Sequence, residues 1–167
     1  LGGPQAGCIV GRAGLIERLR RHPLARAARI DKFCMAALGA TLRHYVEDEA
    51  AQTVPVWRMM GRPADELEAA ARRWAEALGA RGVAAEVRPE RSMVGGGSLP
   101  EETLPTWVVA LPYDHPDRLM ERLRLGEPPV VARIAGDCVA LDPRTVLEGQ
   151  EPALLAAVER AVGALSS

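Results

Sequence analysis

Apolar residues recur every three or four positions in two stretches of the first third of the chain. Residues 13–22 place leucine and isoleucine on one face and arginine on the other, which predicts an amphipathic helix. Asp31 is a favourable N-cap for a longer helix to about residue 50, with an apolar stripe along it. The apolar run Cys-Ile-Val at 8–10 predicts a buried strand.

The helical period breaks at residues 52–63, where prolines and a glycine predict a hinge between two domains, 1–54 and 55–167. Helix and strand patterns alternate beyond it: helix 64–80, strand 83–88, loop 93–105, strand 106–111, helix 115–125, a hairpin of 130–134 with 138–141, and helix 152–165. Strands joined by hairpins and by helices predict an α+β fold, with a small, mostly antiparallel sheet and helices on one face.

Composition narrows the class of protein. Of the 167 residues 48% are apolar and 26% charged, which predicts a packed core, and no apolar run is long enough to span a membrane. Residues 1–62 hold ten cations and five anions, net +5, whereas the rest hold 11 and 17, net −6. The first third is therefore a candidate surface for an anionic partner. Lys32 is the single lysine, and a mechanism that needs one must use it or a lysine outside this chain.

Several segments could carry chemistry. The opening LGGPQAG offers backbone N–H groups without Cβ crowding, which suits a phosphate or simply a tight loop. Arg26 and Arg29 lie in a short connector, where they could form a fork for an anion or cap nearby carbonyls. Arg133 lies within an apolar strand pattern, so it must face solvent, a partner or an anionic ligand. The three histidines show no metal-ligand spacing and no suggestive acid partner, and we assign no metal.

Taken in order, six segments resemble one family, the bacterial selenocysteine synthases, which are pyridoxal-phosphate-dependent L-seryl-tRNA(Sec) selenium transferases. The segments are LGGPQAGCIVGR (1–12), HPLARAARIDK (22–32), MVGGGSLP (93–100), ETLPTWVVAL (102–111), PPVVARI (128–134) and LDPRTVL (141–147). The resemblance implies the C-terminal part of a fold-type-I enzyme, with residues 1–54 closing the cofactor-binding large domain and 55–167 forming the small domain.

The resemblance also implies roles for particular residues. The Schiff-base lysine of the family would lie two residues before Leu1, so Lys32 does not inherit its role and the fragment alone is expected to be inactive. Arg26 and Arg29 match the arginines that face the active site and bind the anionic selenium donor or a substrate group. Arg133 resembles the fold-type-I arginine for the substrate carboxylate, which here would be esterified to tRNA. Gly2, Gly3 and Gln5 are expected to contact the cofactor phosphate.

The partners that the resemblance implies are seryl-tRNA(Sec), selenophosphate and further copies of the chain in a homo-oligomer. We expect a cytoplasmic protein that binds neither membrane nor DNA. Two other readings stay open on the sequence: a related pyridoxal-phosphate lyase that acts on a small phosphorylated amino acid, and a non-catalytic assembly module.

Overall fold

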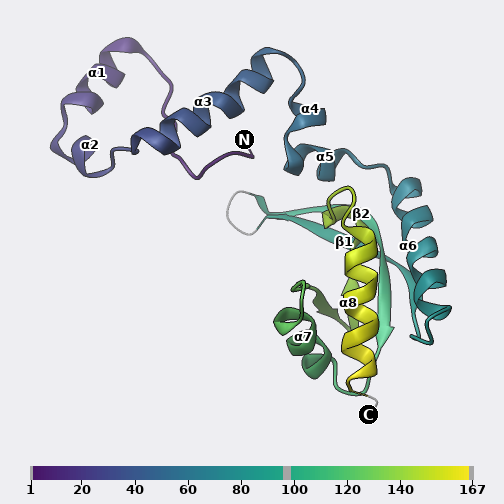
Figure 1. Ribbon diagram of the computed structural model, residues 1–167. Helices are drawn as coiled ribbons and strands as arrows, with labels where there is room; N and C mark the ends of the chain where they lie inside the picture. The colour runs from purple at the N-terminus through teal and green to yellow at the C-terminus, as the bar shows by residue number, and fades with distance from the viewer. Residues whose placement is uncertain (1, 96–98, 166–167) are drawn as a thin grey trace. The chain divides into compact units, whose positions relative to one another are not determined.

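The computed structural model describes residues 2–95 and 99–165 (Figure 1). Two compact units divide the chain, Leu1–Arg58 and Met59–Ser167, and each is described by itself. None of the described helices is long and apolar enough to cross a membrane.

The first unit is helical throughout its regular structure. Its elements are α1 (Ala13–Arg21), α2 (Pro23–Ala27), α3 (Lys32–Val46), α4 (Ala50–Thr53) and α5 (Pro55–Gly61), the last of which continues into the second unit. The sequence prediction of the first two long helices is confirmed, although α3 ends at Val46, earlier than expected. The Asp31 carboxylate accepts hydrogen bonds from the backbone N–H groups of Phe33 at 2.8 Å and Cys34 at 3.0 Å, which makes it the N-cap of α3.

Apolar side chains of the first unit are mostly exposed. Ala50 and Val54 are the buried apolar residues among those described there, whereas Val10 is 95% and Phe33 89% exposed. The predicted buried strand at 8–10 is wrong, because these residues are exposed and lie outside regular structure. A strand is stabilised by hydrogen bonds to neighbouring strands, and the described part of this unit contains none to pair with.

The second unit combines four strands with three long helices. Its elements are α6 (Ala64–Gly79), β1 (Glu86–Gly95), β2 (Leu99–Pro112), α7 (Pro116–Leu125), β3 (Arg133–Ala135), β4 (Cys138–Leu141), the 3₁₀ turn η1 (Pro143–Thr145) and α8 (Glu151–Gly163). The strands form one sheet in the order β1-β2-β4-β3, and every neighbouring pair is antiparallel. The predicted α+β fold is confirmed.

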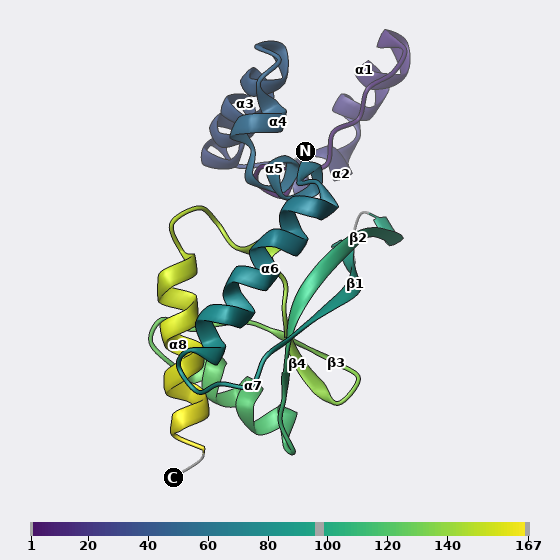
Figure 2. The ribbon, with the colours of Figure 1, turned by 90° about the vertical axis from the view of Figure 1, so that its right-hand side faces the viewer.

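The three helices pack on one face of this sheet (Figure 2). Alternate residues of the strands point toward them, as the two-residue period of a strand requires. The buried core joins Trp74 and Leu78 of α6, Leu119 and Leu123 of α7, Leu155 and Val158 of α8, and Val109, Leu111, Val139 and Leu141 of the sheet.

The region predicted as the loop 93–105 is instead the distal part of a long β1–β2 hairpin. Arg91 pairs with Pro105 and Met93 with Thr103, while residues 96–98 of the predicted loop lie outside the described residues. The prolines suggested a loop, but they lie in a part of β2 that has only one neighbouring strand, β1. The other neighbour, β4, pairs with β2 only from Val109 onward. Proline is tolerated in a strand where no neighbour needs its missing N–H group.

Candidate functional site

The helix-free face of the sheet carries charged side chains above small buried ones. Glu86, Arg88 and Glu90 alternate along β1 on this face. Arg88 donates to Glu86 Oε2 at 2.6 Å and lies 3.5 Å from the buried Cys138 Sγ of β4. The Glu86 carboxylate, followed by the Cys138 sulfur, raises the pKa of Arg88, so this guanidinium remains charged at every working pH.

Arg133 opens β3 on the same face, opposite Ala140 of β4. Its Nη2 lies 3.8 Å from Glu90 Oε2, which is an ion pair without a hydrogen bond. Although 41% of the Arg133 side chain is exposed, Nη2 itself is buried and has no hydrogen-bond partner among the described residues. A buried donor without an acceptor is unfavourable, so this atom suits an oxygen of a ligand.

A pocket of about 300 Å³ adjoins Arg133 and is also lined by Ser92, Asp142 and Thr145. The carboxylate of Asp142 accepts hydrogen bonds from Thr106 Oγ1 at 2.9 Å, from the Arg144 backbone N–H at 3.0 Å and from Ser92 Oγ. Three donors therefore fix the orientation of this carboxylate at the pocket wall.

Arg144, two residues further on, is a structural residue rather than a ligand site. It is 4% exposed, and Nη1 donates to the carbonyl oxygens of Met59, Met60 and Arg62, while Nη2 donates to that of Pro105. Burial lowers the pKa of Arg144, and the nearby Asp142 carboxylate opposes that effect. The side chain therefore ties the end of α5 and Arg62, just before α6, to β2 and η1.

The sequence reasoning missed Glu90, Ser92, Asp142 and Arg144. Asp142 and Arg144 lie in the LDPRTVL segment that supports the family resemblance, but no local pattern indicates which residues they contact. Apart from the Arg144 backbone N–H that Asp142 accepts, the hydrogen-bond partners of these two side chains are 36 to 85 residues away along the chain.

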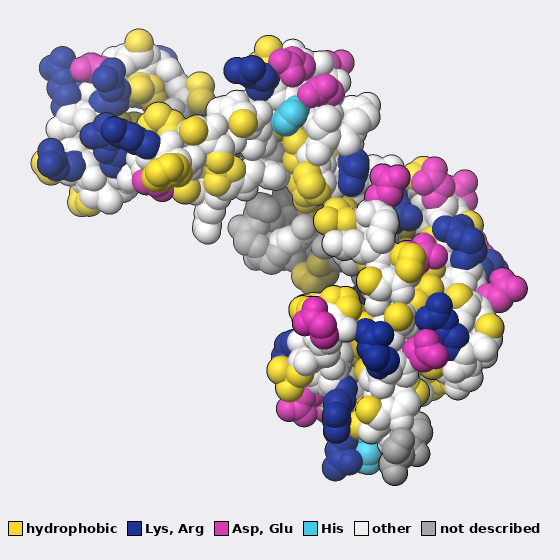
Figure 3. Space-filling view, viewed as in Figure 1, with side chains coloured by type: hydrophobic (Ala, Val, Ile, Leu, Met, Phe, Trp, Pro, Cys, Tyr) yellow, Lys and Arg dark blue, Asp and Glu magenta, His cyan; other side chains and the backbone are white. Residues whose placement is uncertain are grey.

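Arg26 and Arg29 belong to the first unit, and both are exposed. The predicted short connector contains the five-residue helix α2; Arg26 lies in its last turn, and Arg29 follows it. Neither guanidinium makes a hydrogen bond or ion pair with the described residues, so both are free to bind an anion. Basic side chains gather over α1 and α2 (Figure 3).

Gly2 and Gly3 approach other parts of their own unit closely. Gly2 has φ +77°, and a Cβ there would meet side chains of Val54 and Val56; a Cβ on Gly3 would lie 2.5 Å from Thr41 Oγ1. Close packing therefore explains both glycines without a phosphate. Gln5 is exposed and makes no hydrogen bond with the described residues, so its amide is the group in this segment that fits a phosphate oxygen.

Other residues lie apart from these groups. Lys32 is exposed at the start of α3. His44 Nδ1 lies 2.6 Å from Glu49 Oε1, so this histidine has an acid partner that the sequence did not suggest. The possible metal-ligand atoms of His44, Glu47 and Glu49 lie within 4.8 Å of one another.

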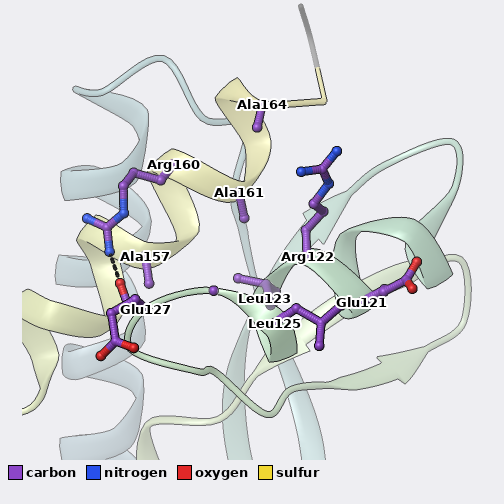
Figure 4. A pocket seen from close by; sticks show the side chains of 10 residues that line it. Glu121, Arg122, Leu123, Leu125, Glu127, Ala157, Arg160, Ala161 and Ala164 are labelled. Atoms are coloured by element: carbon purple, nitrogen blue, oxygen red, sulfur yellow. Dashed lines mark hydrogen bonds between the residues drawn. The ribbon is translucent and has the colours of Figure 1, made fainter.

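A hollow of about 440 Å³ between α7 and α8 is lined by Arg122 and Arg160, and the latter donates to the carbonyl of Glu127 at 2.6 Å (Figure 4). None of the predicted site residues lines it.

The second unit is thus an α+β fold, an antiparallel sheet that is covered by helices on one face and carries charged side chains on the other. A solved structure of D-glucosaminate-6-phosphate ammonia-lyase has the same fold, with a TM-score of 0.53 and 22% identity over 86% of this chain and 35% of the lyase chain.

The sequence comparisons give the family. The sequence model of the L-seryl-tRNA selenium transferase family matches residues 1–147. The L-seryl-tRNA(Sec) selenium transferase of Hyphomonas neptunium is 45% identical over 94% of this chain, and that of Nitratidesulfovibrio vulgaris 46% over 98%. The chain thus belongs to the L-seryl-tRNA selenium transferase family. It spans about a third of the length of these relatives, 35% and 36%.

Proposed function

We propose that this chain is the C-terminal part of a pyridoxal-phosphate-dependent enzyme that converts seryl-tRNA(Sec) to selenocysteinyl-tRNA(Sec) with selenophosphate as selenium donor. The observation that carries the proposal is the family match over residues 1–147, which includes both arginine-bearing units. The likeness to the ammonia-lyase extends to the fold alone. We expect the enzyme to act in the cytoplasm and to assemble as a homo-oligomer.

Arg26 and Arg29 have the properties that a selenophosphate site requires. Both are exposed, three residues apart and without acidic partners among the described residues, so their charge is not already neutralised. Guanidinium groups bind phosphate oxygens with charge-assisted hydrogen bonds. We assign them the task of holding the donor beside the carbon that accepts selenium, and this role is electrostatic.

Arg133 is assigned to the seryl group of the substrate. Its buried Nη2 has no acceptor among the described residues and adjoins a pocket of about 300 Å³. An oxygen of the seryl carboxyl function would accept from it. The pocket is large enough for a group the size of serine.

Pyridoxal phosphate, when bound, supplies an electron sink for loss of the serine hydroxyl. In this chain the backbone of Gly2 and Gly3 and the amide of Gln5 would contact its phosphate, with Gln5 the better supported of the three. Lys32 is not assigned to the cofactor. We expect the chain by itself to be inactive, with the Schiff-base lysine supplied by the segment just upstream of Leu1 in the whole enzyme.

The experiment is a double substitution, Arg26→Ala with Arg29→Ala, in the full-length enzyme. Cofactor absorbance is expected to stay unchanged, while selenium transfer from selenophosphate to seryl-tRNA(Sec) falls by at least about 100-fold, the loss expected for removing two charge-assisted contacts. Arg18→Ala, an exposed arginine of α1, is the matched control and should transfer selenium normally. Unchanged turnover in the double variant would refute the role of these arginines, and a wild-type enzyme without transfer activity would refute the function itself.

A further inference from the structure

We propose that Glu90 and Asp142 tune the Arg133 site to accept an esterified serine carboxyl and to reject the free carboxylate of an amino acid. This inference rests on the proposed function, in which the substrate is serine esterified to tRNA. Free serine carries the same amino and hydroxyl groups as the seryl ester and differs from it only at the carboxyl function. The enzyme therefore needs a means of telling the two carboxyl groups apart.

The first component is the ion pair of Arg133 with Glu90. Nη2 of Arg133 and Oε2 of Glu90 are 3.8 Å apart, and the two side chains are 41% and 37% exposed. At this separation the carboxylate offsets much of the attraction that the guanidinium would have for a second anion. A free carboxylate entering the site would have to compete with Glu90 for the same charge.

The second component is a hydrogen-bond donor of Arg133 that the ion pair does not use. Nη2 is buried, and Glu90 is too distant to accept its hydrogen bond. A carbonyl oxygen needs a donor and no net positive charge, and an ester supplies such an oxygen. Arg133 thus combines a vacant donor with a balanced charge, which favours a neutral acceptor over an anion.

The third component is the remaining charge of the open face. Arg88 is paired with Glu86, so it adds no net positive charge. Asp142 lines the same pocket as Arg133, and its partners are two hydroxyl groups and a backbone N–H, none of which carries charge. The guanidinium of Arg144 lies near Asp142 and offsets its charge, so three carboxylates and three guanidinium groups lie around the site. This face therefore has no excess of positive charge with which to attract a second carboxylate.

The test compares two ligands that lack the amino group and so cannot react with the cofactor: 3-hydroxypropionate, which carries the free carboxylate, and its methyl ester. Their affinities for the full-length enzyme are measured by calorimetry. In Glu90→Gln the affinity for 3-hydroxypropionate should rise about tenfold over wild type, since a charge at this distance is removed, while that for the ester changes less than about twofold. Glu90→Asp, which keeps the charge, should resemble wild type.

Two further variants make the result specific. Glu90→Gln combined with Arg133→Gln should lose the gained carboxylate affinity, because the gain acts through the guanidinium. Glu102→Gln, an exposed acid of β2 without a described ion pair, should leave both affinities unchanged. Circular dichroism checks that each variant is folded.

Carboxylate affinity in Glu90→Gln that does not exceed wild type, including no measurable binding, would overturn the proposal. An equal gain for the ester would overturn it as well. Both outcomes are independent of selenium transfer to seryl-tRNA(Sec) by the wild-type enzyme, which tests the proposed function separately.

Discussion

Arg144 donates a hydrogen bond from Nη2 to the carbonyl oxygen of Pro105 at 2.6 Å and so connects the turn after β4 with the middle of β2. The other end of the guanidinium, Nη1, donates to three carbonyl oxygens just before α6. One buried side chain thereby satisfies four backbone acceptors from two distant segments. Arginine suits this task because its planar fork presents donors in fixed directions.

Replacing this fork should destabilise the second unit. In Arg144→Met the carbonyl oxygens of Met59, Met60, Arg62 and Pro105 lose their described donor, and we expect a loss of about 3 kcal/mol in the free energy of unfolding. Urea unfolding of the full-length protein, followed by tryptophan fluorescence, measures it. Arg118→Met, at an exposed position of α7, is the control and should change stability by less than about 0.5 kcal/mol. Equal stabilities of the two variants would show that the four acceptors find water instead.

Local patterns were sufficient to predict most elements of the fold. The helix cap at Asp31 and the apolar face of α6, with Leu67, Trp74 and Leu78 buried, are determined by residues close together in sequence. The strand at 8–10 failed because strand formation depends on neighbours that local sequence does not specify. The β1–β2 hairpin was missed because glycine and proline indicate a break unless the pairing of each edge is known.

On the open face of the sheet, the sequence indicated one residue of the candidate site, Arg133, because its charge is unusual among apolar neighbours. Arg133 stands out as a charge among apolar residues, and the structure leaves its buried Nη2 without a described partner. Glu90 belongs to a segment of many charges, 43 residues earlier, and nothing in its local pattern distinguishes it. Only the sheet order β1-β2-β4-β3 brings these two side chains to the same face.

Gly3 provides a test of whether the opening segment is glycine-rich for packing. In Gly3→Ala the new Cβ would lie 2.5 Å from Thr41 Oγ1 and 3.0 Å from Thr41 Cβ, so we expect a loss of about 1–3 kcal/mol. The urea midpoint of the full-length protein measures the change. Adding Thr41→Ala, which removes two of the three crowding atoms, should restore part of it. Gly39→Ala, where nothing lies within 4 Å, is the control and should be neutral or stabilising. A Gly3→Ala protein as stable as wild type would instead mean that the segment moves freely away from α3.

Asp31 should make the start of α3 sensitive to acid. A hydrogen bond with the Cys34 side chain, followed by the backbone N–H groups of Cys34 and Phe33, lowers the pKa of Asp31 below its ordinary value of 3.8. A carboxylate whose pKa is lower in the folded state stabilises that state above the unfolded pKa, and this stabilisation disappears as the pH falls through the folded pKa. Amide exchange of Phe33 and Cys34, measured by NMR, should therefore accelerate below about pH 4 relative to the middle of α3.

Two variants separate the contributions to this effect. Asp31→Asn keeps a capping oxygen without a titrating group, so the exchange of the two amides should show no such acid dependence. Cys34→Ala removes the largest contribution, and the pKa of Asp31 should move toward its ordinary value. An unchanged pKa in Cys34→Ala would contradict the role of the thiol.

Asp142 allows its hydrogen bonds to be separated from its charge. In Asp142→Asn the amide oxygen can keep the position that accepts from Thr106 Oγ1 and the Arg144 N–H, while the amide NH₂ donates to the Ser92 hydroxyl, which can rotate to accept. We expect Asp142→Asn to lose about 1 kcal/mol in the free energy of unfolding. Asp142→Ala leaves three donors without their acceptor and should cost about 3 kcal/mol.

The same Asn variant removes one negative charge from the pocket wall, so its affinity for 3-hydroxypropionate should rise. The rise should be smaller than in Glu90→Gln, because Asp142 makes no described ion pair with Arg133. Asp137→Asn, exposed in the β3–β4 turn, is the matched control for both measurements. Equal losses of stability in the Asn and Ala variants would show that the charge of Asp142, rather than its geometry, holds the pocket wall in place.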